Sequence, residues 1–296
     1  IGALLPIPYL RGPCGGAQRI PRGFLKLDTF KGRLFEHCRT TGQWLFRHDP
    51  FFIVSQNRSK TVLICNPEAM DALPKRWEAK AQLFPVNGVS SLDLGYFSAS
   101  LQPKRPFQII TAGKLIRLKG FDLAIKAFEI FVKKCPDSCL TIVGDGPDLS
   151  RLNKTVESAG LGDNVKFNQW IPRESLLKLI ASSDVFLFSG LRDGGGAVVV
   201  EAMAVGKPVV CLAIGGPAMH IDDYCGFKIS ATTPLDSAHG MADALEQLYK
   251  DENLRKTMGN AARQRALNVY HWDRAGDRLK IIYDNLVSTP TGPALP

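Results

Sequence analysis

The chain has 296 residues, of which 45% are hydrophobic and 22% are charged, and it carries a net charge of +9. A chain of this length can form two domains with buried cores, and its composition excludes a mostly disordered protein. It contains no run of about 18 apolar residues, so we expect no transmembrane helix. The first ten residues are apolar but include two prolines, and no positively charged residue precedes them, so we expect no signal peptide.

The first hundred residues contain few recognisable elements. A helix with mixed aromatic and basic residues is expected at about 31–47, and short strands are expected at 60–66 and 81–87. The segment LQPKRP at 101–106 carries two prolines and is typical of a linker. We therefore interpret residues 1–103 as a partial Rossmann-like domain, because two strands are too few for a complete one.

Basic residues are concentrated between residues 11 and 47, with eight lysines and arginines against two acidic residues: Arg11, Arg19, Arg22, Lys26, Lys31, Arg33, Arg39 and Arg47. Large apolar residues are interleaved with them: Phe24, Leu27, Phe30, Leu34, Phe35, Trp44 and Phe46. Two interpretations stay open: either the apolar residues form the domain core beneath solvated arginines, or the segment binds an anionic membrane surface. We expect no nucleic-acid partner, because no recognition motif accompanies the charge.

From residue 104 onward, apolar runs alternate with helical patterns. Strands are expected at 107–113, 139–146, 164–170, 184–190 and 207–214, and helices at 121–134, 148–160, 174–183 and 197–206. This alternation predicts a parallel sheet with right-handed crossovers, so residues 104–272 are interpreted as a Rossmann-like domain of the α/β class. Three helices are expected to end the chain, at 237–250, 252–268 and 273–288.

Ligands of a doubly wound sheet bind beyond the carboxyl ends of its strands. In the first such loop, GKLIRLKG, Lys114 follows a strand and Lys119 precedes a helix. Two cations beside a helix N-terminus suit a diphosphate, because the helix end adds partial positive charge. The alternative is that both are solvated loop lysines.

A glycine-rich loop at Gly194, Gly195 and Gly196 precedes the helix that begins near residue 197. Glycines allow backbone N–H groups to approach an anion closely. Asp193 is either a ligand contact or a helix N-cap. Glu201 lies in an apolar stretch and needs a partner, which a ribose diol or an internal salt bridge could supply. The turn Asp145-Gly146-Pro147 favours a structural role.

Other chemistries lack their sequence signatures. No GxGxxG, Walker lysine motif, GxSxG or HExxH is present. Seven cysteines form no Cys-x-x-Cys pair and five histidines show no metal spacing, so we expect no metal site. The odd number of scattered cysteines favours a reducing, cytoplasmic compartment.

The order of GKL…KG, VGDGP and D-GGG-AVVVEAMAVGKPVV resembles the retaining GT-B glycosyltransferases of the family 4 (group 1) type. The resemblance is strong over residues 104–287 and weak over 8–100. It implies two Rossmann-like domains facing a cleft, with an N-terminal domain shorter than in family members. It also implies that the terminal helix at 273–288 crosses back to the N-terminal domain.

The resemblance also implies roles for individual residues. Asp193 and Glu201 correspond to the family's E-x7-E pair, with aspartate in place of the more usual glutamate, and Lys114 and Lys119 correspond to its diphosphate-binding cations. Catalytic roles are thereby implied for Asp193, Lys119 and Lys114. Donor-binding roles are implied for Gly113, Gly194, Gly195, Gly196, Glu201, Trp170 and Ile171. The segment GPCGGAQRIP is similar to a glycine-rich segment of some members and implies an acceptor-side role for Gly15 and Gly16.

The function implied is transfer of a sugar from a nucleoside diphosphate sugar to an acceptor hydroxyl with retention of anomeric configuration, as in polysaccharide biosynthesis. The acceptor would be a saccharide or a lipid-linked molecule, and the protein would be cytoplasmic or peripheral on a membrane. No metal or other cofactor is expected, because two lysines and a helix N-terminus can stabilise the leaving diphosphate. The alternatives are a truncated, inactive nucleotide-sugar-binding protein and a sugar-nucleotide epimerase on the same fold.

Overall fold

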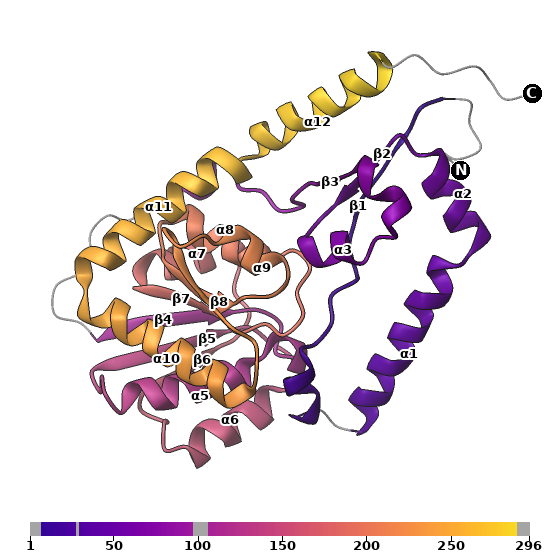
Figure 1. Ribbon diagram of the computed structural model, residues 1–296. Helices are drawn as coiled ribbons and strands as arrows, with labels where there is room; N and C mark the ends of the chain where they lie inside the picture. The colour runs from indigo at the N-terminus through magenta and orange to yellow at the C-terminus, as the bar shows by residue number, and fades with distance from the viewer. Residues whose placement is uncertain (1–6, 28–29, 97–105, 289–296) are drawn as a thin grey trace, which may run out of the picture.

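The computed structural model describes residues 7–27, 30–96 and 106–288, which form a small N-terminal lobe and a larger C-terminal lobe (Figure 1). Each lobe is built on a parallel sheet, and the α/β architecture that the resemblance implies is confirmed. The predicted boundary at residue 103 and most of the predicted linker fall within 97–105, outside the described residues.

The sheet of the C-terminal lobe has six parallel strands in the order β6-β5-β4-β7-β8-β9. Their bounds are β4 Phe107–Ala112, β5 Ser138–Val143, β6 Val165–Asn168, β7 Val185–Phe188, β8 Val209–Leu212 and β9 Gly226–Ile229. Five strands coincide with the predicted apolar runs. The edge strand β9 was not predicted, because it is short and only its first residue is buried. Strand order reverses between β4 and β7, and such a switch point places a ligand crevice at the carboxyl ends.

Helices cover both faces of this sheet (Figure 1). They are α5 Phe121–Val132, α6 Leu149–Ser158, α7 Arg173–Ser182, α8 Ala197–Ala204, α9 Gly215–His220, α10 Pro234–Lys250, α11 Glu252–Tyr270 and α12 Trp272–Ser288. One apolar core lies under α5, α6 and α10, and a second lies under α7, α8 and α11. The helix predicted at 121–134 is confirmed as α5, and its apolar stripe of Phe121, Ala124, Ile125, Phe128 and Phe131 is buried. The short helix α9 was not predicted.

The N-terminal lobe contains a three-stranded parallel sheet in the order β1-β2-β3. Its strands are β1 Leu10–Cys14, β2 Thr61–Ile64 and β3 Ala81–Leu83, and its helices are α1 Phe30–Arg47, α2 Pro50–Arg58, α3 Pro67–Asp71 and α4 Ser91–Leu94. Short 3-10 turns occur at Arg22–Leu27, Lys75–Lys80 and, in the C-terminal lobe, Arg117–Lys119. Strand β1 and helix α2 were not predicted; β1 contains Gly12 and Pro13, residues that argue against a strand.

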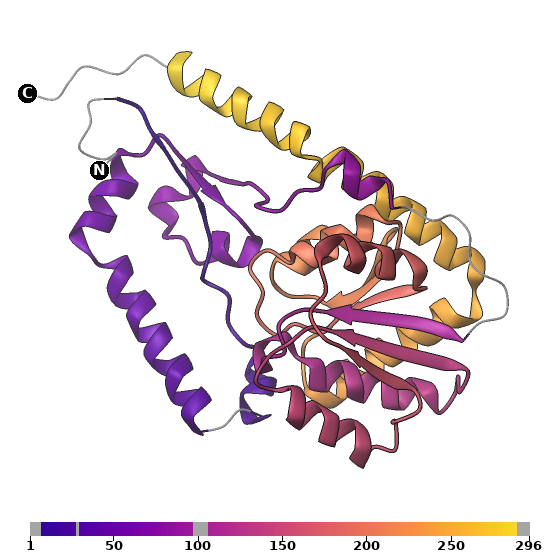
Figure 2. The same cartoon turned by 180° about the vertical axis from the view of Figure 1, so that it is seen from behind.

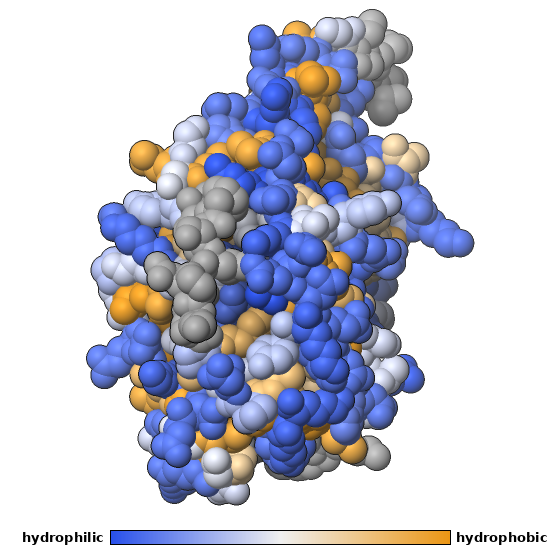
Figure 3. Space-filling model, turned by 90° about the vertical axis from the view of Figure 1, so that its left-hand side faces the viewer, coloured by the Kyte–Doolittle hydropathy of each residue, from blue (hydrophilic) through white to orange (hydrophobic). Residues whose placement is uncertain are grey.

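Helix α1 lies at the outer margin of the N-terminal lobe, and its apolar residues are not in a core (Figure 2). Leu34, Phe35, Trp44 and Phe46 are 52–63% exposed, so the interpretation that they form the domain core is wrong for these four. Phe24 is buried, and the side chains of Leu27 and Phe30 lie outside the described residues. By contrast, the surface on the side of α10 and α11 is mostly hydrophilic, with small scattered apolar groups (Figure 3).

The two lobes are joined where the chain passes from α11 to α12. The N–H of Val89 donates to the carbonyl of Tyr270 at 2.9 Å, and the N–H of Trp272 donates to the carbonyl of Val89 at 3.1 Å. Along α12, the guanidinium of Arg278 lies 5.6 Å from the ring centre of Phe84. The terminal helix therefore contacts the segment that follows β3. Among the described helices, none is long and apolar enough to cross a membrane.

Gly120 shapes the turn that presents Lys119. It has a φ of +64°, and an added Cβ would lie 2.1 Å from the carbonyl oxygen of Ser189. We predict that Gly120→Ala lowers the free energy of unfolding by more than the roughly 1–2 kcal/mol expected from left-handed backbone alone. Gly160→Ala is the matched control, because Gly160 has a φ of +67° and nothing within 4 Å of the added Cβ. Urea unfolding of both variants measures the difference, and equal destabilisation would contradict the close contact.

Candidate functional site

A cavity of about 810 Å³ opens at the carboxyl ends of the strands in the C-terminal lobe. It is lined by most of the residues for which the sequence implied catalytic or donor-binding roles: Gly113, Lys114, Lys119, Trp170, Ile171, Asp193, Gly195, Gly196 and Glu201. The GKL and DGGG loops therefore face one crevice, as predicted. Gly194 lies in the same turn, against the side chain of Gln18.

The VGDGP turn packs against the GKL loop and is hydrogen-bonded to it. The N–H of Leu115 donates to the carbonyl of Asp145 at 2.8 Å, and a Cβ on Gly146 would lie 2.3 Å from the carbonyl oxygen of Leu115. The carboxylate of Asp145 also accepts from the N–H of Trp170 at 2.9 Å. The structural role favoured for this turn is thus visible in its contacts, although Asp145 also lines the cavity.

Lys114 and Lys119 differ in their partners. Lys114 is exposed and makes no ion pair with any residue that the structure describes. Lys119 forms an ion pair with Asp193, in which the side chains are 28% and 14% exposed. Burial raises the pKa of Asp193, but the hydrogen bond and charge of Lys119 and the N–H groups of the glycine turn outweigh it and hold that pKa below its ordinary value.

The glycine turn closes around the Asp193 carboxylate. Its Oδ1 accepts from the N–H of Gly196 at 2.8 Å and from that of Gly195 at 3.1 Å. Asp193 therefore forms the turn that precedes α8, and it is not the helix N-cap, which is Gly196 without a side-chain capping bond. The expectation that all three glycine amides are available to an anion needs correction, since two of them already have an acceptor.

His220 holds the other side of the same turn. Its Nε2 is hydrogen-bonded to the carbonyl of Gly195, and its ring packs edge-on against Tyr270 with centroids 4.8 Å apart. Burial, together with the nearby Arg265, lowers the pKa of His220 to about 4. The imidazole is therefore neutral near pH 7, with Nε2 as its donor. Its buried Nδ1 has no hydrogen-bond partner among the described residues.

Glu201 is paired inside the protein, as the second alternative for it proposed. Its carboxylate accepts from Nε of Arg173 at 2.6 Å, and the same guanidinium also binds Asp93. Asp93 is buried and completes a capping box with Ser90 at the start of α4. Burial raises the pKa of Asp93, but the bonds from Arg173 and Ser90 hold it below its ordinary value. Glu201 still lines the cavity beside Arg173, so a ribose would share its carboxylate with that arginine.

Sequence reasoning missed three residues at the site. Asn87 lines the cavity, and its buried Nδ2 has no partner among the described residues. The Nε2 of Gln18 is also buried without a partner, next to Gly194. The asparagine-glycine pair at Asn87 and Gly88 could have signalled Asn87, whereas nothing in the sequence marks Gln18 or Arg173.

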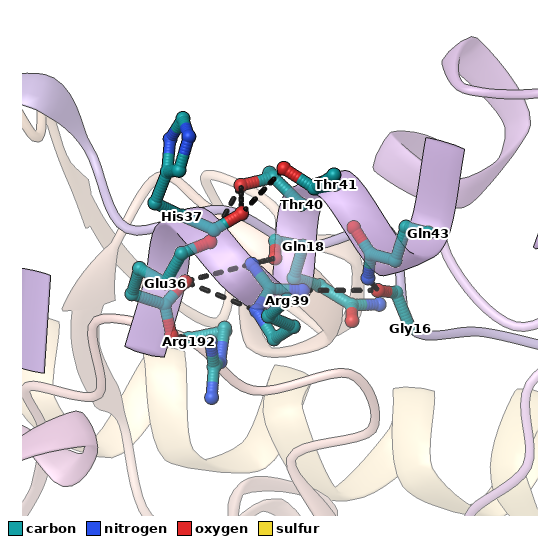
Figure 4. Close-up of polar contacts among 9 residues, drawn as sticks. All are labelled: Gly16, Gln18, Glu36, His37, Arg39, Thr40, Thr41, Gln43 and Arg192. Carbon is teal, nitrogen blue, oxygen red and sulfur yellow. Dashed lines mark hydrogen bonds and ion pairs between the residues drawn. The ribbon is translucent and has the colours of Figure 1, made fainter. Parts of the chain in front are cut away.

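Gly15 and Gly16 are not in this cavity; they line a second one, of about 330 Å³, in the N-terminal lobe. Helix α1 binds their loop: Arg39 donates to the carbonyls of Gln18 and Gly16, and Gln43 donates to that of Gly16 (Figure 4). Glu36 of α1 pairs with both Arg39 and Arg192, and Arg192 directly precedes Asp193. The loop of Gly15 and the glycine turn are therefore linked through α1.

Comparison with known proteins identifies the family. A sequence profile described as glycosyl transferases group 1 matches residues 96–265, more than half of the chain. The chain belongs to this family. It is 36% identical over 184 residues to a D-inositol 3-phosphate glycosyltransferase of Paenarthrobacter aurescens, covering 60% of this chain and 44% of that protein. It is 32% identical over 179 residues to the GDP-mannose-dependent alpha-(1-6)-phosphatidylinositol monomannoside mannosyltransferase of Mycolicibacterium smegmatis, covering 58% and 46%. The chain spans about half the length of the curated relatives it matches.

Solved structures of glycosyltransferases share the fold. The sucrose-phosphate synthase of Thermosynechococcus elongatus superposes with a TM-score of 0.67 at 21% identity, covering 92% of this chain and 68% of that one. The pneumococcal O-GlcNAc transferase GtfA, solved in complex with UDP and GlcNAc, gives a TM-score of 0.65 at 20% identity, covering 79% and 46%. These likenesses confirm the GT-B arrangement that the sequence motifs implied.

The lowered pKa of His220 makes a prediction about stability and pH. The unfolded chain binds a proton on this histidine below about pH 6.5, whereas the folded chain does so only below about pH 4. The free energy of unfolding should therefore fall as the pH drops from 6.5 to 4, by up to about 3 kcal/mol from this group. His220→Gln should flatten this dependence in urea titrations, while the exposed His239→Gln should keep it. A parallel pH dependence in both variants would remove His220 as the cause.

Proposed function

We propose that the chain contributes the donor site of an enzyme that transfers a sugar from a nucleoside diphosphate sugar to an acceptor hydroxyl, with retention of anomeric configuration. The observation that carries the proposal is the single cavity that gathers Lys114, Lys119, the glycine turn and Glu201 at the carboxyl ends of a sheet in a group 1 glycosyl transferase. A cavity of this size and position is where α/β proteins of this class bind nucleotides.

The diphosphate is the leaving group, so catalysis consists chiefly of stabilising its growing charge. Lys114 supplies a cation that no described acid neutralises, and the N-terminus of α8 at the cavity wall adds partial positive charge. No metal or other cofactor is invoked, because these groups supply the electrostatic stabilisation.

Lys119 enters the reaction by exchanging partners. In the described structure it neutralises Asp193. An incoming diphosphate offers Lys119 a second anion, which loosens its pair with Asp193. The Asp193 oxygen that faced Lys119 then accepts from a hydroxyl of the transferred sugar, while Oδ1 stays on the glycine amides. Glu201 accepts from the ribose, and Asn87, with its unpartnered Nδ2, donates to a donor oxygen.

Stability, not donor binding, separates the two lysines. We predict that Lys114→Ala, Lys119→Ala and Glu201→Ala each weaken nucleoside diphosphate sugar binding by about 1–3 kcal/mol, the range for hydrogen bonds to charged groups. Of the two lysine variants, only Lys119→Ala should also lower the free energy of unfolding clearly, because it leaves the largely buried Asp193 carboxylate without its cation. Lys114→Ala should stay within roughly 0.5 kcal/mol of the parent in stability.

The measurement is protection against thermal unfolding across a screen of nucleoside diphosphate sugars, followed by calorimetry. Lys126→Ala is the control, since Lys126 is an exposed residue of α5 that pairs with Glu129. Unchanged binding in all three site variants would place the diphosphate elsewhere. Binding without transfer to any acceptor would favour the inactive, nucleotide-sugar-binding alternative, and NMR of a product's anomeric proton tests retention.

We further propose that α1 and α2 hold the protein at an anionic membrane surface. Phe35, Trp44 and Phe51 are 63%, 59% and 85% exposed, and arginines lie among them along the same helices. Aromatic side chains with basic neighbours suit the headgroup layer. A relative named for a phosphatidylinositol monomannoside substrate is consistent with work at such a surface.

Sedimentation with vesicles tests this surface. We predict that the protein binds vesicles containing phosphatidylserine and binds phosphatidylcholine vesicles less, with the difference reduced at high salt because salt screens each basic contact of roughly 1 kcal/mol. The double variant Trp44→Ser with Phe51→Ser should sediment less. Tyr224→Ser is the control, because Tyr224 is 79% exposed on the C-terminal lobe. Equal recovery of every protein in the supernatant at both salt concentrations would leave α1 simply solvated.

A further inference from the structure

The second cavity, beside Gly15 and Gly16, is built differently from the donor cavity. It lies between β1, α1, α2 and the segment after α3, and has a volume of about 330 Å³. Figure 1 shows α1 and β1 on either side of this part of the lobe. Two guanidinium groups line it, those of Arg11 and Arg47, and none of its lining residues is acidic.

Both arginines carry uncompensated charge. Neither forms an ion pair with a residue that the structure describes. Arg11 is held in place by stacking 4.3 Å above the Phe52 ring and by donating to the Ser55 hydroxyl at 3.1 Å, which leaves its other N–H groups for a ligand. Cations without acidic neighbours beside apolar walls create a strong local preference for an anion.

The rest of the cavity is mostly apolar, with two glutamines, Gln43 and Gln56, among its lining residues. Phe46, Phe52, Ile64 and Leu73 form its walls. Gln56 also lines it and is 2% exposed, yet its buried Oε1 has no hydrogen-bond partner among the described residues. A buried amide oxygen without a donor is unfavourable, so a hydrogen-bond donor that enters the cavity would satisfy it.

We propose that this cavity binds an anionic amphiphile, namely a phosphate ester of a long apolar alcohol. The phosphate lies between Arg11 and Arg47, and the apolar chain lies along Phe46 and Leu73. A planar guanidinium group can donate two parallel hydrogen bonds to a pair of phosphate oxygens, and the apolar walls can cover an alkyl chain. Free phosphate would pair with the arginines but would leave the apolar walls uncovered. An uncharged alkyl compound would cover the walls but would leave the arginines unpaired.

The position of the cavity suggests what this ligand is for. Gly15 and Gly16 line the cavity, and their loop continues to Gln18, which contacts Gly194 of the donor turn. This assignment rests on the glycosyl transfer proposed above: the amphiphile is the lipid part of the acceptor, and the hydroxyl that receives the sugar belongs to another part of that molecule. The binding site itself does not depend on that assignment.

Calorimetry with decyl phosphate, at concentrations below those at which it forms micelles, tests the proposal on the full chain. Arg11→Gln and Arg47→Gln should each weaken binding about tenfold or more, the loss expected for one charged hydrogen bond. Arg22→Gln is the matched control, because it removes the same charge from an exposed residue of the same segment and should change binding less than about twofold. Ala72→Phe, which narrows the cavity, should also weaken binding.

Two further probes separate the contribution of the phosphate from that of the alkyl chain. Inorganic phosphate and decyl maltoside should each bind at least about tenfold more weakly than decyl phosphate, because the first lacks the alkyl chain and the second lacks the charge. Equal binding of either probe, or parent-like affinity in both arginine variants, would overturn the proposal. Donor binding, measured on the same variants, should be unchanged. If no nucleoside diphosphate sugar binds while decyl phosphate still depends on Arg11 and Arg47, the proposed transfer fails and the cavity assignment stands.

Discussion

The largely buried carboxylate of Asp193, whose side chain is 14% exposed, is the constraint on which the donor side of the molecule depends. A charge with so little access to water must be neutralised and hydrogen-bonded, and Asp193 contacts three loops through its carboxylate and its backbone. It accepts from the amides of Gly195 and Gly196, pairs with Lys119, and its own carbonyl accepts from the N–H of Gly216 at 3.0 Å. The GKL loop, the glycine turn and the start of α9 are thus positioned by one residue.

The neighbour of Asp193 extends this organisation into the other lobe. Arg192 pairs with Glu36 of α1, and both side chains are largely buried, at 16% and 12% exposure. Burial raises the pKa of Glu36, but the hydrogen bonds and charges of Arg39 and Arg192 lower it by more, so the pKa lies below its ordinary value. This carboxylate therefore stays charged near neutral pH. The glycine turn, α1 and the loop of Gly16 are therefore connected by one chain of contacts, from Arg192 through Glu36 to Arg39.

The sequence predicted the C-terminal lobe well because strong periodicity and packing agree there. The apolar stripe of α5 is buried on one side of the helix, and the run that forms β4 is buried along almost its whole length, so their patterns are unambiguous. Strand β1 was missed because Gly12 and Pro13 interrupt it, and its place depends on pairing with β2 from fifty residues away. The order of the motifs placed Lys119, Asp193 and Glu201 at one cavity. It could not show that Lys119 forms an ion pair with Asp193, or that Arg173 forms one with Glu201. Those are contacts between segments far apart in sequence, which no local pattern records.

The two cavities differ in how far their cations are compensated. In the proposed donor cavity, Lys119 is paired with Asp193, and Arg173, next to the lining residue Glu201, is paired with Glu201 and Asp93. Lys114 has no described acidic partner, so a donor would meet one open cation and would otherwise exchange partners with existing ion pairs. Such an exchange of ion-pair partners adds little long-range attraction for the donor. It restricts how the donor can be placed, because each carboxylate that loses its cation needs a new hydroxyl at hydrogen-bond distance. In the cavity of Arg11 and Arg47 no described acid compensates the charge, so attraction acts over roughly a Debye length and weakens with salt. The first design suits discrimination among nucleotide sugars, and the second suits capture of an anionic ligand from a surface.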